Sequence, residues 1–231
     1  INIFKKEIEK KKIICGIGYQ LRYEKILYKI KKLIDTNALG KIKKVNIKNR
    51  HFLPYHHRYE DYRTGYAANK SLGGGVLLCF IHEIDYAIYL FGTPKSLRCS
   101  LNKKSDLQMD VEDTAKLTLY YNDHETFNIN MTLDFIKKHE ERFLKIKFEK
   151  GWIFWDLKVN TLKINYNSEK QEVKFQSHRK RDTLFTKQLR SFLKSVQRKK
   201  QPVSNYTNGI ESLKLVTLAK KSSRLEKTIN L

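Results

Sequence analysis

The stretch from Gly73 to Gly92, GGGVLLCFIHEIDYAIYLFG, constrains the fold more than any other part of the chain. After three glycines, residues 76–91 are almost wholly apolar, and their length predicts one helix. A helix that is apolar on all sides is normally buried, so polar side chains within it must be paired or used. Cys79 and His82 are three residues apart and share a helix face, and Asp85 follows His82 by the same spacing. We therefore expect His82 to transfer protons, with Asp85 as its local partner.

Composition indicates a folded domain. The chain has 231 residues, of which 40% are hydrophobic and 12% aromatic, enough to form a substantial core. No apolar run reaches the roughly 18 residues of a membrane span, and the first dozen residues lack the apolar segment of a secretory signal. Cys15, Cys79 and Cys99 form no CxxC pair, which predicts neither a disulfide framework nor a zinc site. We expect a cytoplasmic protein without a membrane partner or a metal centre.

The net charge of +23 raises the hypothesis of nucleic-acid binding. Lysines are spread along the whole chain, with local clusters at 10–12, 178–181 and 198–200. No zinc finger, RNP-like aromatic pair or recognition-helix motif accompanies these clusters. A basic nucleic-acid-binding domain is therefore the less favoured alternative, and the salt dependence of duplex binding would test it.

Alternating apolar and polar residues predict strands through the second half of the chain. The alternation runs through residues 115–121, 127–133, 144–148 and 162–166. Helices are expected at 1–12, at 23–39 with Gly40 as the cap, and twice near the C-terminus, whereas Ile13–Tyr19 predicts a short buried strand. The expected fold is α+β, a large mostly antiparallel open sheet with helices packed on one face.

Several short motifs are spaced along the chain. GYQLRY at 18–23 is followed by DYR at 61–63, by the 73–92 stretch, and by Pro202, Gly209 and Ser212-Leu213 near the end. Their order and spacing resemble the Gfo/Idh/MocA oxidoreductases over nearly the whole chain. The resemblance implies a Rossmann domain that binds NAD or NADP, followed by an α+β domain that provides most of the substrate pocket.

The cofactor-binding motif of such a Rossmann domain is not found in this sequence. Gly16-Ile17-Gly18 lacks the third glycine of GxGxxG and has no βαβ unit behind it, and the family's Glu-Lys-Pro segment is missing. We interpret residues 1–18 as the last helix and strand of a dinucleotide-binding domain, and residues 19–231 as the substrate-binding and oligomerisation domain. No cofactor is expected to bind this chain alone.

The resemblance implies that His82 is the acid–base group, which Asp85 would orient. Cys79 stands where the family usually has an aspartate that bonds a substrate hydroxyl. Polar residues of the other motifs are expected to join Cys79 in a substrate pocket: Tyr19, Arg22, His57, Tyr62 and Arg63. The two arginines would fit a carboxylate or phosphate. The alternatives are a core histidine bonded to Asp85 and a satisfied surface network of Arg and Tyr.

These expectations together describe the C-terminal substrate-binding domain of an NAD(P)-dependent oxidoreductase acting on a sugar or nucleotide-sugar. A homo-oligomer would form through the open sheet face, and the chain would not turn over by itself, because nothing in it would hold the cofactor. Whether the chain is itself an enzyme is left open. The alternative is a catalytically inactive binding or assembly module of the same fold, which Cys79 in place of aspartate favours.

Overall fold

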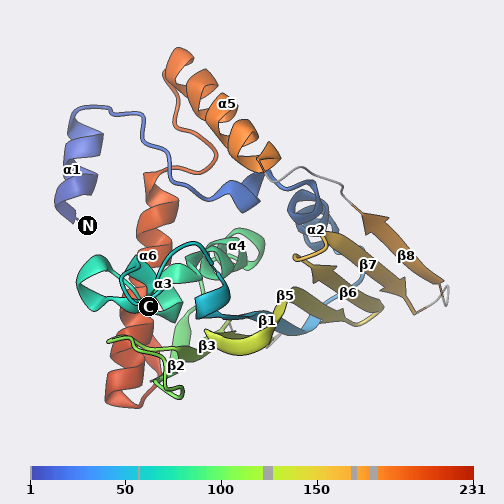
Figure 1. Ribbon diagram of the computed structural model, residues 1–231. Helices are drawn as coiled ribbons and strands as arrows, with labels where there is room; N and C mark the ends of the chain where they lie inside the picture. Colours follow the sequence, from blue (N-terminus) through green and yellow to red (C-terminus); the bar gives the residue numbers. More distant parts are fainter. Residues whose placement is uncertain (1, 57, 122–126, 168–170, 177–181) are drawn as a thin grey trace.

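The computed structural model describes residues 2–56, 58–121, 127–167, 171–176 and 182–231 (Figure 1). The helices are α1 Asn2–Lys10, α2 Lys25–Asp35, α3 Val76–Cys79, α4 Ile81–Phe91, α5 Thr183–Gln197 and α6 Tyr206–Leu225. Four short 3-10 turns are η1 Gln20–Tyr23, η2 Leu53–Tyr55, η3 Tyr66–Ala68 and η4 Lys70–Leu72. The strands are β1 Ile42–Phe52, β2 Ser96–Asn102, β3 Thr114–Tyr120, β4 Asn128–Asp134, β5 Ile136–Phe148, β6 Gly151–Asp156, β7 Thr161–Tyr166, β8 Gln171–Gln176 and β9 Ile229–Asn230.

The described strands form one open sheet in the order β8-β7-β6-β5-β1-β4-β3-β2-β9. Neighbouring strands are antiparallel except for β1 and β4, which run parallel with Val45 opposite Ile129. Figure 1 shows α2 and α4 over one side of this sheet and α6 beside its β2 end. The α+β fold with a large, mostly antiparallel open sheet is therefore confirmed.

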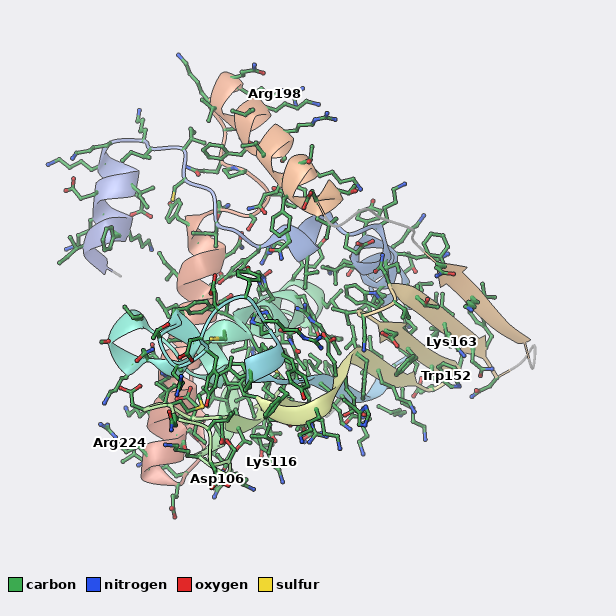
Figure 2. The ribbon with its side chains drawn as sticks, viewed as in Figure 1. Asp106, Lys116, Trp152, Lys163, Arg198 and Arg224 are labelled. Carbon is green, nitrogen blue, oxygen red and sulfur yellow. The ribbon has the colours of Figure 1, made fainter. Side chains whose placement is uncertain are left out.

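The two faces of the sheet differ as the alternating sequence pattern requires. One face carries the core, with completely buried side chains such as Ile47, Ile146 and Trp155 packed beneath the helices. The other face carries lysines and half-exposed aromatic rings, and Figure 2 shows Lys116 and Trp152 on the side away from α4. The helix-covered face thus forms the core, and the opposite face is the open surface of the domain.

Hydrogen bonds join α6 to the sheet at β2. The Ser222 hydroxyl accepts from the backbone N–H of Cys99 at 3.0 Å and donates to the carbonyl of Lys227. The next side chain, Ser223, accepts from the N–H of Leu101 at 2.9 Å. These two serines satisfy backbone groups of β2 that another strand would otherwise pair.

Three local expectations are wrong. The helix expected over residues 76–91 is two helices, α3 and α4, because Phe80 leaves the helical conformation and packs its ring against Phe135 at 5.0 Å. The strand expected at Ile13–Tyr19 is a single bridge from Gly16 to Asn205, since among the described residues only the segment before α6 lies beside it. Helix α2 ends at Asp35 instead of continuing toward Gly40.

None of the described helices is by itself long and apolar enough to cross a membrane. The segments Lys70–Cys79 and Ile81–Phe91, which meet at 46°, pass that test on length and composition only when taken together.

Candidate active site

The three glycines place the start of α3 against the loop before it. The N–H of Gly74 donates to the carbonyl of Asn69 at 2.9 Å, and that of Gly75 donates to the carbonyl of Ala67 at 3.1 Å. A Cβ on Gly74 would lie 2.8 Å from the Ala67 carbonyl oxygen, and Gly75 has a φ of +100°. Only glycine allows this close approach and this backbone angle, so the glycines fix where α3 and α4 begin.

His82 lies half-buried on the first turn of α4. Its imidazole meets the ring of Tyr19 edge-on, with the ring centroids 5.7 Å apart. Its Nδ1 atom is buried and has no hydrogen-bond partner among the described residues. Burial is the main cause that lowers the pKa of His82, Glu83 acts in the opposite direction, and Arg142 acts in the same direction. The imidazole is therefore neutral at pH 7 and able to accept a proton.

A pocket of about 260 Å³ opens beside His82. It is bounded by η1, by the end of β1, by the loop after it, and by residues of α3, α4 and β5. Its lining combines aromatic and apolar walls with polar side chains: Gln20, Asn49, His51, His56, Tyr66, Ala67, Cys79, Phe80, His82, Phe135, Glu140 and Arg142. Such a mixture suits a small polar molecule that is held by hydrogen bonds against apolar surface.

Arg142 reaches the pocket from β5 and is held by Glu83. Its Nε donates to Glu83 Oε1 at 2.7 Å, and the Glu83 side chain is completely buried. The other guanidinium N–H groups of Arg142 make no hydrogen bond with the described residues, and Arg142 lines the pocket. Glu83 therefore orients a guanidinium that can donate to a ligand beside His82.

Asp85 does not bind His82 in this structure, which corrects the expectation that it orients the imidazole. Its carboxylate accepts from Nε of Arg22 at 3.1 Å and from Nη2 at 2.8 Å. Burial raises the pKa of Asp85 to about 6, although the bond to Arg22 opposes that rise. Arg22 is thus occupied behind the pocket and also lies over the ring of Tyr89, so it does not reach the pocket to bind an anion.

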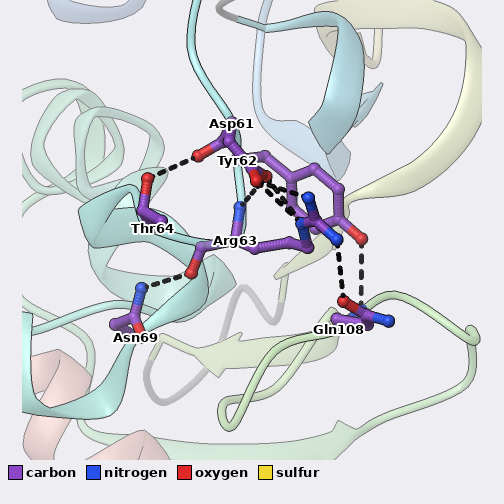
Figure 3. Close-up of polar contacts among 6 residues, drawn as sticks. All are labelled: Asp61, Tyr62, Arg63, Thr64, Asn69 and Gln108. Carbon is purple, nitrogen blue, oxygen red and sulfur yellow. Dashed lines mark hydrogen bonds and ion pairs between the residues drawn. The ribbon is translucent and has the colours of Figure 1, made fainter.

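The DYR motif forms polar contacts within its loop and with Gln108 (Figure 3), and its residues are not in the lining of the His82 pocket. Arg63 is bound by Asp61, with its Nε 2.8 Å from Asp61 Oδ1, and its backbone carbonyl accepts from Asn69. The Tyr62 hydroxyl accepts from the N–H of Gln108 at 3.2 Å. Tyr62 and Arg63 therefore secure the loop instead of lining the pocket as expected.

The remaining expected site residues are placed differently. Cys79 lines the pocket together with His82, as their spacing predicts, and Tyr19 lies against the imidazole just outside the lining. His57 lies outside the described residues. Burial raises the pKa of the Cys79 thiol to about 12, the nearby Tyr66 hydroxyl opposes that rise, and Glu112 adds to it. Cys79 is therefore a neutral thiol, neither a nucleophile nor an anionic ligand at pH 7.

Several pocket residues were not singled out from the sequence. Arg142 and Glu140 lie on β5. The alternating pattern of β5 predicts a strand but does not predict that these two side chains line a pocket. Asn49 is an exception to this, because it follows Val45 and Ile47 at the next inward position of β1 and is buried. A buried polar residue on a core-facing position is the signal that could have found it.

Backbone N–H groups in the two glycine-containing segments are hydrogen-bonded within the chain. A pyrophosphate needs free backbone N–H groups at a glycine-rich turn before a helix. The N–H groups of Gly74 and Gly75 donate to carbonyl groups of the preceding loop. The N–H of Ile17, between Gly16 and Gly18, donates to the carbonyl of Ser204. Among the described residues no group of three His, Cys, Asp or Glu side chains could hold a metal ion.

Several solved structures share this architecture. The aldose-aldose oxidoreductase of Caulobacter crescentus, crystallised with glycerol, is 19% identical with a TM-score of 0.82, over 96% of this chain and 65% of that one. An inositol dehydrogenase homolog of Azotobacter vinelandii with NAD+ is 12% identical with a TM-score of 0.83, over 100% and 68%. Levoglucosan dehydrogenase with NADH and levoglucosan is 14% identical with a TM-score of 0.80, over 95% and 67%.

The TM-scores show that these structures share the fold of this chain. The likeness extends to the fold alone, because all three sequence identities are below 25%. The chain spans only about two thirds of the length of each of these structures. No curated protein matches the chain by sequence. The family model for the C-terminal alpha/beta domain of the oxidoreductase family matches residues 31–231. The chain therefore belongs to the Gfo/Idh/MocA oxidoreductase family, of which it carries the C-terminal alpha/beta domain.

Proposed function

We propose that this chain is the substrate-binding part of an NAD(P)-dependent oxidoreductase that acts on a sugar or sugar derivative, with His82 as the acid–base residue. Residues 19–231 would be the substrate domain, and residues 1–18 would belong to the dinucleotide-binding side. The similar structures support the substrate class, since their names include an aldose oxidoreductase and dehydrogenases of inositol and levoglucosan.

The observation that carries the proposal is that His82 lines a polar pocket while its buried Nδ1 has no hydrogen-bond partner among the described residues. Leaving a buried polar atom unpaired costs about 1–3 kcal/mol. A buried polar atom that stays unpaired calls for an explanation, and a catalytic role is one that fits a histidine lining a pocket. The lowered pKa of His82 fits the same role, because a base must be neutral before it accepts a proton.

The residues of this chain would act as follows. A substrate hydroxyl donates to neutral His82, which takes its proton. The nicotinamide of NAD(P)+, when bound, would accept the hydride from the same carbon. Arg142, fixed by Glu83, donates to a neighbouring oxygen and holds the substrate in register. Tyr19 restricts the imidazole by edge-on contact. Cys79 would contact the substrate as a neutral, weak donor where the family has an aspartate.

The open sheet face supports a proposed homo-oligomer. Half-exposed Phe143 and Phe154 pack on each other there at 5.3 Å between ring centroids, near half-exposed Trp152. Aromatic surface of this kind is typical of subunit contacts. We also propose a cytoplasmic location, which is supported by the three free cysteines Cys15, Cys79 and Cys99.

One observation favours a second candidate, a binding module without catalysis. The neutral thiol of Cys79 cannot make the charged hydrogen bond that an aspartate would make to a substrate hydroxyl. Under this alternative the His82 pocket binds a sugar and no oxidation follows.

Oxidation of aldoses and polyols by the native gene product, followed as NAD(P)H absorbance, tests the proposal. We expect His82→Asn to lower kcat/KM by roughly 10²–10⁴-fold, whereas Arg224→Gln, at an exposed position on α6, leaves it unchanged. If the protein binds sugars but oxidises none, and if Cys79→Asp produces no oxidation either, the result would support the binding module instead. Turnover that His82→Asn leaves intact would contradict the role given to His82.

A further inference from the structure

A second pocket, whose wall includes the exposed Tyr55 and Arg58, adjoins the His82 pocket and is called the outer pocket below. It has a volume of about 400 Å³, against about 260 Å³ for the inner one. The two pockets share His51, His56 and Glu140 in their walls. A molecule whose reacting carbon lies at His82 would reach the outer pocket by passing these three side chains, of which His51 and His56 are stacked at 4.7 Å between ring centroids.

The outer pocket is strongly cationic. Arg58, Lys138 and Lys158 line it, and Glu140 is the only carboxylate among its described lining residues. Glu140 Oε2 lies 3.7 Å from Lys158 Nζ, so this carboxylate is matched by one of the three cations. Arg58 and Lys138 have no carboxylate partner among the described residues, which leaves two positive charges in the pocket wall for a ligand.

Aromatic rings hold these two cations in place. The Arg58 guanidinium lies 5.1 Å from the centroid of the Tyr55 ring, and Lys138 Nζ lies 5.9 Å from that of Phe52. The two rings pack edge-on at 4.9 Å, so they form one support for both charges. Cation–π contact limits the freedom of long side chains, which lowers the entropy lost when they close on an anion.

We propose that the outer pocket binds a phosphoryl group carried by the same substrate that His82 contacts, which makes the substrate a phosphorylated or nucleotide-linked sugar. Arg58 and Lys138 are its binding residues, and His139 adds a further polar side chain to the wall. Arginine pairs with phosphate oxygens in a fixed fork and lysine acts as a point charge, which together suit a phosphoryl group. This inference rests on the proposed function of the inner pocket.

Calorimetric titration of the 231-residue chain with glucose, glucose 1-phosphate, UDP-glucose and UDP tests the proposal. We expect glucose 1-phosphate or UDP-glucose to bind at least about tenfold tighter than glucose, since two cations contribute about 1.4 kcal/mol or more. The Arg58→Gln/Lys138→Gln variant should lose that gain and keep its glucose affinity. The Lys221→Gln/Arg224→Gln variant, with the same change of charge on α6, should keep the gain.

The increase in affinity over glucose distinguishes a sugar phosphate from a nucleotide sugar. A gain confined to UDP-glucose identifies a nucleotide sugar, and a gain already complete with glucose 1-phosphate identifies a sugar phosphate. UDP that binds as tightly as UDP-glucose would overturn the proposal, because the sugar would then contribute nothing. Equal affinities for glucose and its phosphorylated forms, or equal loss in the α6 variant, would also overturn it. If the double variant does not fold, Lys138→Gln alone should lose part of the gain.

Failure here and failure of the proposed function can be told apart. Phosphoryl-dependent binding by a protein that oxidises no sugar would refute the oxidoreductase and leave the outer pocket as assigned. Oxidation of neutral sugars, with no gain from a phosphoryl group in either KM or affinity, would refute the outer pocket and leave the role of His82.

Discussion

Arg22 and Asp85 form a buried ion pair that ties η1 to the middle of α4. Arg22 Nη2 lies 2.8 Å from Asp85 Oδ1, and the two side chains are 6% and 1% exposed. The two residues are 63 positions apart in the sequence. The pair holds the GYQLRY segment against α4, and the same segment brings Tyr19 onto the imidazole of His82. Two of the motifs that suggested the family are therefore joined by a structural ion pair.

Removal of one charge from this pair should be costly. We expect Asp85→Asn to lower the free energy of unfolding by roughly 3–5 kcal/mol, because it leaves the buried guanidinium of Arg22 without a counter-charge. Urea unfolding measures the loss. Arg22→Met/Asp85→Leu should lose less than Asp85→Asn alone, since apolar groups then replace both charges.

The exposed pair of Asp61 and Arg63 is the matched control for that experiment. It has the same residue types and a similar fork of hydrogen bonds, but it faces solvent. Asp61→Asn should therefore leave the unfolding midpoint almost unchanged. Equal effects of Asp85→Asn and Asp61→Asn would contradict the role given to the buried pair.

The stability of the fold should depend on pH through His82. Its pKa in the folded state is lowered below 6.5, mainly by burial. Below pH 6.5 the unfolded chain takes up a proton at this position before the folded chain does, so stability from this group is lost as the pH falls. We expect urea unfolding to show wild type losing stability relative to His82→Gln between pH 7.5 and about 5.

Asp85 changes the stability of the fold with pH in the opposite direction to His82. Its pKa is raised from 3.8 to about 6 by burial, so the folded state binds its proton first and gains stability from this group as the pH falls through that window. This contribution cancels in the comparison of wild type with His82→Gln, since both contain Asp85. An unchanged difference between the two proteins over the whole range would contradict the lowered pKa of His82.

Cys79 should react slowly with alkylating agents. With a pKa of about 12, its thiolate fraction at pH 8 is far below that of free cysteine, whose pKa is about 8.5. We expect iodoacetamide to modify Cys79 at least about a hundredfold more slowly in the native chain than in the urea-unfolded chain, as followed by mass spectrometry of the peptides. Labelling of Cys79 at the unfolded rate would show that the thiol is neither buried nor neutral.

Ser222 should matter more to stability than its neighbour Ser223. Ser222→Ala leaves the buried N–H of Cys99 without its acceptor, which should cost about 1–3 kcal/mol. Ser223 is half-exposed, so water can replace its bond to Leu101 and Ser223→Ala should cost less. Thermal unfolding of the two variants gives the comparison, and the reverse order would contradict the anchoring of α6 on β2.

The sheet could be predicted from the sequence because its signal is local. Each strand carries its own alternation, and residues such as Leu117 and Met131 point inward without reference to any other segment. The break at Phe80 could not be predicted in this way. It depends on contact with Phe135, which lies 55 positions later in the sequence and directly after β4.

Site residues that share one helical segment could be predicted from their spacing. Contacts between residues of different helices and strands could not. His82 and Cys79 share the pocket, as their spacing indicates. Asp85 is three residues from His82 as well, but its partner comes from η1, and no spacing rule reveals that a distant arginine competes for the carboxylate. Arg142 likewise meets Glu83 across 59 positions of sequence. Long-range pairing of charges is decided by the packing of the whole domain.

The central claim is that a sugar binds against His82. NMR spectra of the chain with labelled histidine, titrated with glucose and with glucose 1-phosphate, test it most directly, since His82→Asn identifies the His82 signal. We predict that the His82 imidazole signal shifts with the same saturation curve as the calorimetric binding. Binding that saturates while the His82 signal stays in place would contradict the claim.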